Sequence, residues 1–139
     1  MKRIIHNLVV LFATLIAYYF FVENYSEIMP VNYIWNGVLG MLAFPFIFGA
    51  IACYLFRGIS IVRAILVSLI PIVALSPMLM AGSDPAKPGL EYYIYMVFIV
   101  SFCVGAFAEI GSYYLFKYVK QKNTPNKSLN PDAQNARAG

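Results

Sequence analysis

The chain has 139 residues, of which 61% are hydrophobic and 12% are charged. Soluble globular domains carry about 25% charged residues, so this composition excludes an ordinary soluble fold. The formal net charge of +4 does not indicate a nucleic-acid partner, because the basic residues lie at the ends of apolar segments and form no basic face. We therefore expect an integral membrane protein that contacts the lipid bilayer and binds no nucleic acid.

Apolar segments follow one another along the sequence, and each is long enough to cross a bilayer core of about 30 Å as an α-helix. The predicted spans are residues 4–22, 34–56, 59–80 and 92–116. The first span follows Lys2 and Arg3 but has bulky residues at its exit, which indicates an uncleaved span rather than a signal peptide. The sequence predicts an all-α membrane protein, with four transmembrane helices in a small antiparallel bundle over residues 1–122.

The connections between the spans differ in length. Only a few residues around Gly58 join the second span to the third, so these two helices should form an antiparallel hairpin and be neighbours. The other two connections, ENYSEIMPVNY and AGSDPAKPGLE, are polar and contain proline, which argues against long regular structure. Residues 123–139 have Leu129 as their single bulky apolar residue, and we expect them to form a disordered polar cytoplasmic tail.

The basic residues divide unevenly between the two sides of the predicted bundle. If the N-terminus is cytoplasmic, nine of the ten lysines and arginines lie on the cytoplasmic side, and only Lys87 lies outside. Lysine and arginine near the ends of spans set the orientation of a membrane protein. We therefore expect the N-terminus and the C-terminus in the cytoplasm, and the chain in a bacterial cytoplasmic (inner) membrane.

Aromatic residues gather near the predicted span ends. The outer set is Tyr18, Tyr19, Tyr33, Trp35, Tyr92 and Tyr93, and the inner set is Tyr54, Tyr113, Tyr114 and Tyr118. Aromatic side chains are enriched where the membrane meets water. We interpret both sets as interfacial belts rather than as a cage for a cationic ligand.

The fourth span carries a face of small residues. Ser101, Gly105, Ala108 and Ser112 recur at positions i, i+4, i+7 and i+11. Small residues let helices approach each other closely in lipid, so this face is predicted to pack against another helix. In the second span, small stripes include one formed by Gly49 and Cys53.

Glu109 lies inside the apolar fourth span, beside this small face. It lies seven residues before Phe116, which places it about 10 Å inside the cytoplasmic end, and Arg63 lies about 6 Å from the same boundary. A lone charge in the bilayer centre costs from about 2.5 kcal/mol upward, so we predict an Arg63–Glu109 ion pair. His6 and Asn7 enter the membrane from the same side, and His6 or Asn7 is expected to add hydrogen bonds to the pair. The alternative is that Glu109 carries protons or cations, with Arg63 or His6 tuning its charge state.

The sequence indicates no catalytic residues. It contains no HExxH, no GxSxG, no glycine-rich phosphate loop and no group of aspartates that would hold magnesium. Cys53 and Cys103 lie in separate apolar segments and form no metal motif. We expect a protein that is not an enzyme and has neither a cofactor nor a metal site.

Two functions are compatible with these features. The first is a non-enzymatic accessory, sensing or protective membrane component that acts through helix–helix contacts, with another membrane protein or a second copy as partner. The alternative is a small oligomeric proton-coupled exporter or cation carrier that uses Glu109. Length and span number are similar to those of small multidrug exporters, but their essential glutamate belongs to the first helix, and span 4–22 has none.

Overall fold

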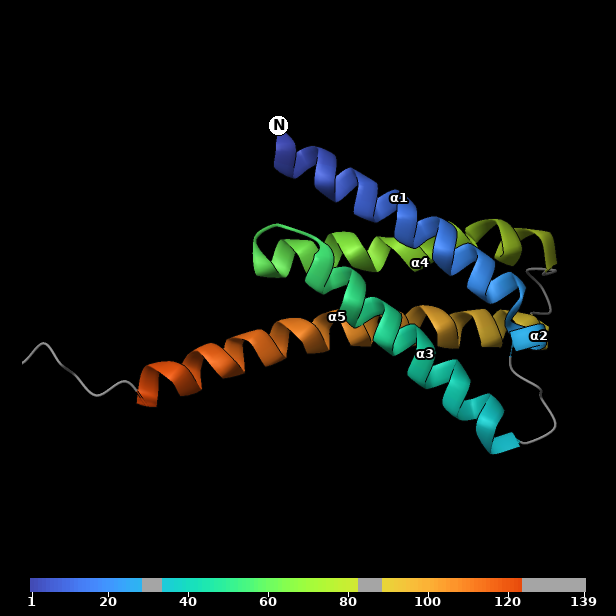
Figure 1. The fold of residues 1–139 in the computed structure, drawn as a ribbon. Helices are drawn as coiled ribbons and strands as arrows, with labels where there is room; N and C mark the ends of the chain where they lie inside the picture. Colours follow the sequence, from blue (N-terminus) through green and yellow to red (C-terminus); the bar gives the residue numbers. More distant parts are fainter. Residues whose placement is uncertain (29–33, 83–88, 124–139) are drawn as a thin grey trace, which may run out of the picture.

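The structure, a computed structural model, describes residues 1–28, 34–82 and 89–123, and these are helical almost throughout (Figure 1). The elements are α1 (Lys2–Glu23), the short α2 (Tyr25–Ile28), α3 (Ile34–Leu55), α4 (Ser60–Gly82) and α5 (Leu90–Asn123). Among the described residues, four helices, α1, α3, α4 and α5, are long and apolar enough to cross a membrane. The prediction of an all-α membrane protein with four spanning helices packed as a bundle is confirmed.

The helices begin and end close to the predicted spans except at the C-terminus of α5. The predicted span stops at residue 116, whereas α5 continues to Asn123. Its 34 residues correspond to about 51 Å, well beyond a hydrocarbon core of about 30 Å. Lys120 and Lys122 lie in the last turn, where positive charge complements the helix dipole. Residues 111–123 are all exposed, so α5 extends past the bundle at this end (Figure 1).

The predictions about the two polar connections and the C-terminal tail fall mainly on residues that the structure does not describe. The connections predicted around residues 29–33 and 83–88, and the predicted tail from residue 124 onward, lie outside the described residues. Asn123, the first residue of the predicted tail, is the last residue of α5.

The four long helices alternate in direction along the chain, and α3 crosses over α5 (Figure 1). The α3–α5 contact is the most extensive in the bundle, followed by the contact of α4 with α5. Helix α1 packs mainly on α4. Helices α3 and α4 do contact each other, as their short connection requires, but each packs more extensively on α5. Helix α5 is therefore the element that holds the bundle together.

An aromatic cluster fills the core where α1 approaches α5. Tyr18 is fully buried, its ring centroid lies 4.9 Å from that of Phe102, and its hydroxyl donates to the carbonyl oxygen of Phe98 at 3.0 Å. The prediction that Tyr18 belongs to an interfacial belt is therefore wrong. A tyrosine near a span end can turn inward when a carbonyl is within reach of its hydroxyl, because the bond removes the cost of burying the polar group.

Helix α1 buries little of its surface within the chain. Tyr18, Phe21 and Val22 are its only buried residues, and they lie near its C-terminus. Apolar side chains of its N-terminal half, such as Ile4 and Phe12, are exposed. In a bilayer these side chains face lipid or another protein rather than water.

Candidate site: an intramembrane ion pair

Arg63 and Glu109 form an ion pair between α4 and α5. Arg63 lies in the first turn of α4, and its Nη2 donates to Oε2 of Glu109 at 2.9 Å and to Oε1 at 3.1 Å. The two side chains are 13% and 15% exposed. The structure thus brings together the two charged residues that sequence reasoning placed at similar depth.

The guanidinium of Arg63 uses one nitrogen for both carboxylate oxygens. Its Nε is buried and has no hydrogen-bond partner among the described residues. In a bidentate arginine–carboxylate pair, two guanidinium nitrogens each donate to one carboxylate oxygen, and such a pair is stronger. The Arg63–Glu109 pair therefore uses fewer of the guanidinium donors than a bidentate pair does. The guanidinium carbon lies 5.9 Å from the ring centroid of Tyr113, one turn after Glu109 on α5. Helix α5 therefore holds Arg63 through a carboxylate and through a ring face.

Helix α3 adds a thiol to this site. Cys53, in the last turn of α3, is fully buried and lies close enough to the Glu109 carboxylate to interact with it. Three helices therefore meet at Glu109. Sequence reasoning treated Cys53 as a packing residue, although its place near the end of α3 puts it at the same end of the bundle as Arg63.

His6 and Asn7 lie at this end of the bundle but bind other groups. Nε2 of His6 lies 3.1 Å from the carbonyl oxygen of Leu55. The Asn7 amide brackets Arg57, since its Oδ1 accepts from the backbone N–H at 2.8 Å and its Nδ2 donates to the carbonyl oxygen. The expectation that these side chains add hydrogen bonds to the ion pair is wrong. The last carbonyls of a helix lack intrahelical donors, and the end of α3 offers such acceptors to α1.

Two glycines set the crossing of α3 and α5. A Cβ added at Gly105 would collide with the backbone of Phe46, and a Cβ added at Gly49 would collide with the backbone of Phe102. The two helices therefore touch backbone to backbone in both directions. Gly105 belongs to the predicted small face, and Gly49 belongs to one of the stripes noted in the second span.

The other members of the predicted small face differ in how deeply they are buried. Ser101 is buried, and Ala108 is half-buried. Ser112 is exposed, and its hydroxyl donates to the carbonyl oxygen of Ala108 at 2.8 Å on its own helix. The predicted face is therefore too long by one turn, because α5 has already left the bundle where Ser112 lies.

The site offers limited chemistry. Within the described part of the chain, no three side chains of histidine, cysteine, aspartate or glutamate come close enough to hold a metal ion. Cys53 and Cys103 are both free thiols. What remains is one carboxylate with both oxygens engaged, one guanidinium and one thiol. Of these groups, Arg63 and Glu109 form the ion pair between α4 and α5.

The chain was compared with known proteins on three levels. Family models, curated sequences and solved structures gave no match. The structural facts are those of a four-helix membrane protein in which a largely buried ion pair joins α4 to α5.

Proposed function

We propose that the chain is a non-enzymatic accessory protein of the membrane that acts by packing against a transmembrane helix of another membrane protein. The observation that carries this proposal is a shallow apolar groove of about 250 Å³ between α1 and α3. Ala13, Thr14 and Ala17 of α1 form one wall, and α3 forms the other. Ala13 and Ala17 are exposed and one helical turn apart, which is the small-residue spacing that favours helix association in lipid.

The groove is held open by contacts on both sides of it. Toward the N-terminus of α1, Asn7 is bonded to the backbone of Arg57. Toward its C-terminus, the ring of Phe21 lies 5.6 Å from that of Phe48 on α3. Between these contacts, residues 8–17 of α1 pass along α3 and none of them is buried. A preformed groove of this kind lowers the ordering cost that an incoming helix must meet.

A cross-linking experiment tests this proposal. A benzophenone amino acid replaces Phe20, which is exposed and lies on the face of Ala13 and Ala17, and in a control it replaces Phe107, exposed on α5. After irradiation of native membranes, the probe at residue 20 should link one discrete protein, and the probe at residue 107 should not.

The identified protein is then co-expressed with variants of the full chain. Ala17→Phe should reduce its co-purification by at least about tenfold, since a bulky ring prevents close helix approach. Val73→Phe, at an exposed position of α4 outside the groove, should leave co-purification unchanged. Equal recovery with Ala17→Phe, or equal cross-linking from both probes, would contradict the proposal.

The same proposal places both termini in the cytoplasm of a bacterial cell. The described basic residues support this orientation, because they gather where α1 begins, where α3 meets α4 and where α5 ends. They are Lys2, Arg3, Arg57, Arg63, Lys117, Lys120 and Lys122. Cysteines introduced at Gly89 and at Lys122, in a Cys53→Ala, Cys103→Ala background, bracket α5. In intact cells an impermeant maleimide should label position 89 and leave position 122 unlabelled, and the reverse pattern would overturn the orientation.

The geometry supports a structural role for Glu109 better than the alternative of a proton or cation carrier. Both of its oxygens accept hydrogen bonds from Arg63, and its side chain is 15% exposed. A carrier must exchange its proton or cation with water on each side of the membrane. Glu109 does not line the groove between α1 and α3.

A further inference from the structure

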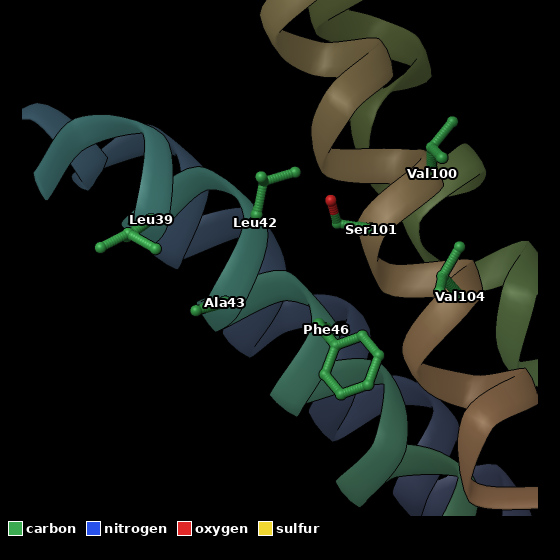
Figure 2. A pocket seen from close by; sticks show the side chains of 7 residues that line it. All are labelled: Leu39, Leu42, Ala43, Phe46, Val100, Ser101 and Val104. Atoms are coloured by element: carbon green, nitrogen blue, oxygen red, sulfur yellow. The ribbon is translucent and has the colours of Figure 1, made fainter. Parts of the chain in front are cut away.

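A second apolar groove, of about 410 Å³, lies between α3 and α5 (Figure 2). Leucine, alanine and phenylalanine side chains of α3 form one wall, and Val100, Ser101 and Val104 of α5 form the other. The groove follows from the crossing described above. The two helices touch at Gly49 and Gly105 and diverge toward the N-terminus of α3 (Figure 1), which leaves a wedge between them.

Ser101 is the polar group of this wedge. Its side chain is directed into the groove (Figure 2), and the residue is only 7% exposed. The hydroxyl makes no hydrogen bond with any residue that the structure describes, unlike the hydroxyls of three other serines of the bundle. Ser68, Ser76 and Ser112 donate to carbonyls of their own helices at 2.7, 2.9 and 2.8 Å. In hydrocarbon an unbonded hydroxyl is costly, so the orientation of Ser101 favours an acceptor brought by a ligand.

We propose that the α3–α5 groove binds a neutral, largely hydrocarbon molecule dissolved in the membrane, and that a carbonyl oxygen of this molecule accepts a hydrogen bond from Ser101. The groove lining contains no charged residue, which disfavours an ion. Its volume falls in the range of about 300–1,000 Å³ that small-molecule sites occupy.

The depth of Ser101 separates this ligand from a phospholipid chain. Ser101 lies eleven residues after Leu90, the first residue of α5, which corresponds to about 16 Å along the helix. That is close to the middle of a hydrocarbon core about 30 Å thick. An acyl chain has no hydrogen-bond acceptor at that depth, whereas a ketone or ester carried within a hydrocarbon molecule has one.

A second copy of the chain is a poorer occupant. A two-fold contact centred on this face would set one groove against the same groove of the partner, since isologous interfaces join identical surfaces. Two concave faces leave the wedge unfilled. The small ligand is therefore the occupant that the shape favours.

The test uses the purified full chain in lipid nanodiscs and two matched probes, 2-tridecanone and tridecane, which differ in the carbonyl. The apparent Kd of each is obtained from the dependence of the Tm on its mole fraction in the lipid. The wild type should bind the ketone about fivefold more tightly than the alkane, as one hydrogen bond would give. Ser101→Ala should abolish this preference, and Ser112→Ala, at the exposed serine of the same helix, should retain it.

Further variants keep the test decisive. Val104→Trp fills the wedge and should abolish the response to both probes. If Ser101→Ala does not fold, Ser101→Cys keeps a similar size with a weaker donor and should lose most of the preference. Equal affinity of the wild type for ketone and alkane, or a preference that survives both Ser101 variants, would overturn the proposal. A dimer in light scattering that Val104→Trp dissociates would overturn it in favour of a second copy.

Discussion

Helix α5 is held on two sides by contacts of different kinds. Against α3 its backbone touches another backbone through Gly105 and Gly49. Against α4 it is joined by the ion pair of Glu109 with Arg63. The first contact tolerates no added atom. The second tolerates the loss of both charges far better than the loss of one, because a single remaining buried charge has no partner.

Both contacts hold helices together where the hydrophobic effect contributes little. Apolar side chains gain little by leaving lipid for a protein interior, so helix contacts in a membrane must draw on close packing and on polar groups. Close backbone approach adds dispersion and weak Cα–H···O contacts over many atoms. The ion pair instead reduces the cost that each charge would carry alone in the bilayer. Substitutions on α5 distinguish the two contacts.

The largest effect is expected from Glu109→Gln. The variant leaves the guanidinium of Arg63 largely buried without its counter-charge, which should lower the free energy of unfolding by about 3–5 kcal/mol. Unfolding by SDS in mixed micelles measures the change. Glu91→Gln, an exposed acid in the first turn of the same helix, is the control and should cost less than about 1 kcal/mol. Equal losses in both variants would show that the pair does not contribute.

A somewhat smaller loss is expected from Gly105→Ala. The new methyl group would collide with the backbone of Phe46, and overpacking of this kind costs about 1–3 kcal/mol. Gly111→Ala on the same helix adds the same methyl group where nothing lies within 4 Å, and it should be neutral or slightly stabilising. The same SDS titration compares the two. A harmless Gly105→Ala would mean that α3 and α5 do not cross backbone to backbone.

Tyr18→Phe sharpens the comparison by testing a third attachment of α5. The variant keeps the ring in the aromatic core and removes only the bond to the carbonyl oxygen of Phe98, so a loss of about 1 kcal/mol is expected. Tyr19→Phe changes the neighbouring, half-buried tyrosine and should change stability by less than about 0.5 kcal/mol. If the two variants are indistinguishable, the Tyr18 bond does not help to fix α1 on α5.

The smallest expected effect concerns alkaline pH. Burial raises the pKa of Tyr25 above its ordinary value of 10.0, and its ring lies 5.1 Å from that of Phe98 on α5. The folded pKa is the higher one, so this contribution to stability is complete below pH 10 and is lost as pH rises through the folded value. Unfolding at pH 8 and pH 11 should show a smaller alkaline loss for Tyr25→Phe than for the wild type. The same alkaline loss in both proteins would exclude Tyr25 as its source.

Sequence reasoning succeeded where a single helix or a common depth carried the signal. Continuous apolar segments are sufficient to predict four spans, since each must satisfy its own backbone within the bilayer. The helical rise places Arg63 and Glu109 at similar depth, and the structure brings them together. Gly105 stands out because small residues at helical spacing indicate close approach.

Sequence reasoning failed to predict which helix packs against which, and which groups the polar side chains bind. The sequence shows that α3 and α4 are linked, yet it does not show that α3 packs mainly on α5, because the contact depends on the backbone of Phe46 and Phe102. His6 and Asn7 bind backbone groups at the C-terminal end of α3, and the pattern of side chains in the sequence does not predict such backbone contacts. Tyr18, Phe21 and Tyr25 are spaced at i, i+3 and i+7, which places them on one side of a helix. This spacing could have predicted that the three side chains face the core together.

The measurement that tests the account most directly is a double-mutant cycle on the ion pair. It compares the free energy of unfolding of the wild type, Glu109→Gln, Arg63→Gln and the double variant under identical micelle conditions. We predict a coupling energy of at least about 3 kcal/mol, because each single variant leaves one buried charge unpaired and the double variant recovers much of the stability that Glu109→Gln loses. A coupling energy indistinguishable from zero, with the two single losses simply adding, would contradict the conclusion that this pair joins α4 to α5.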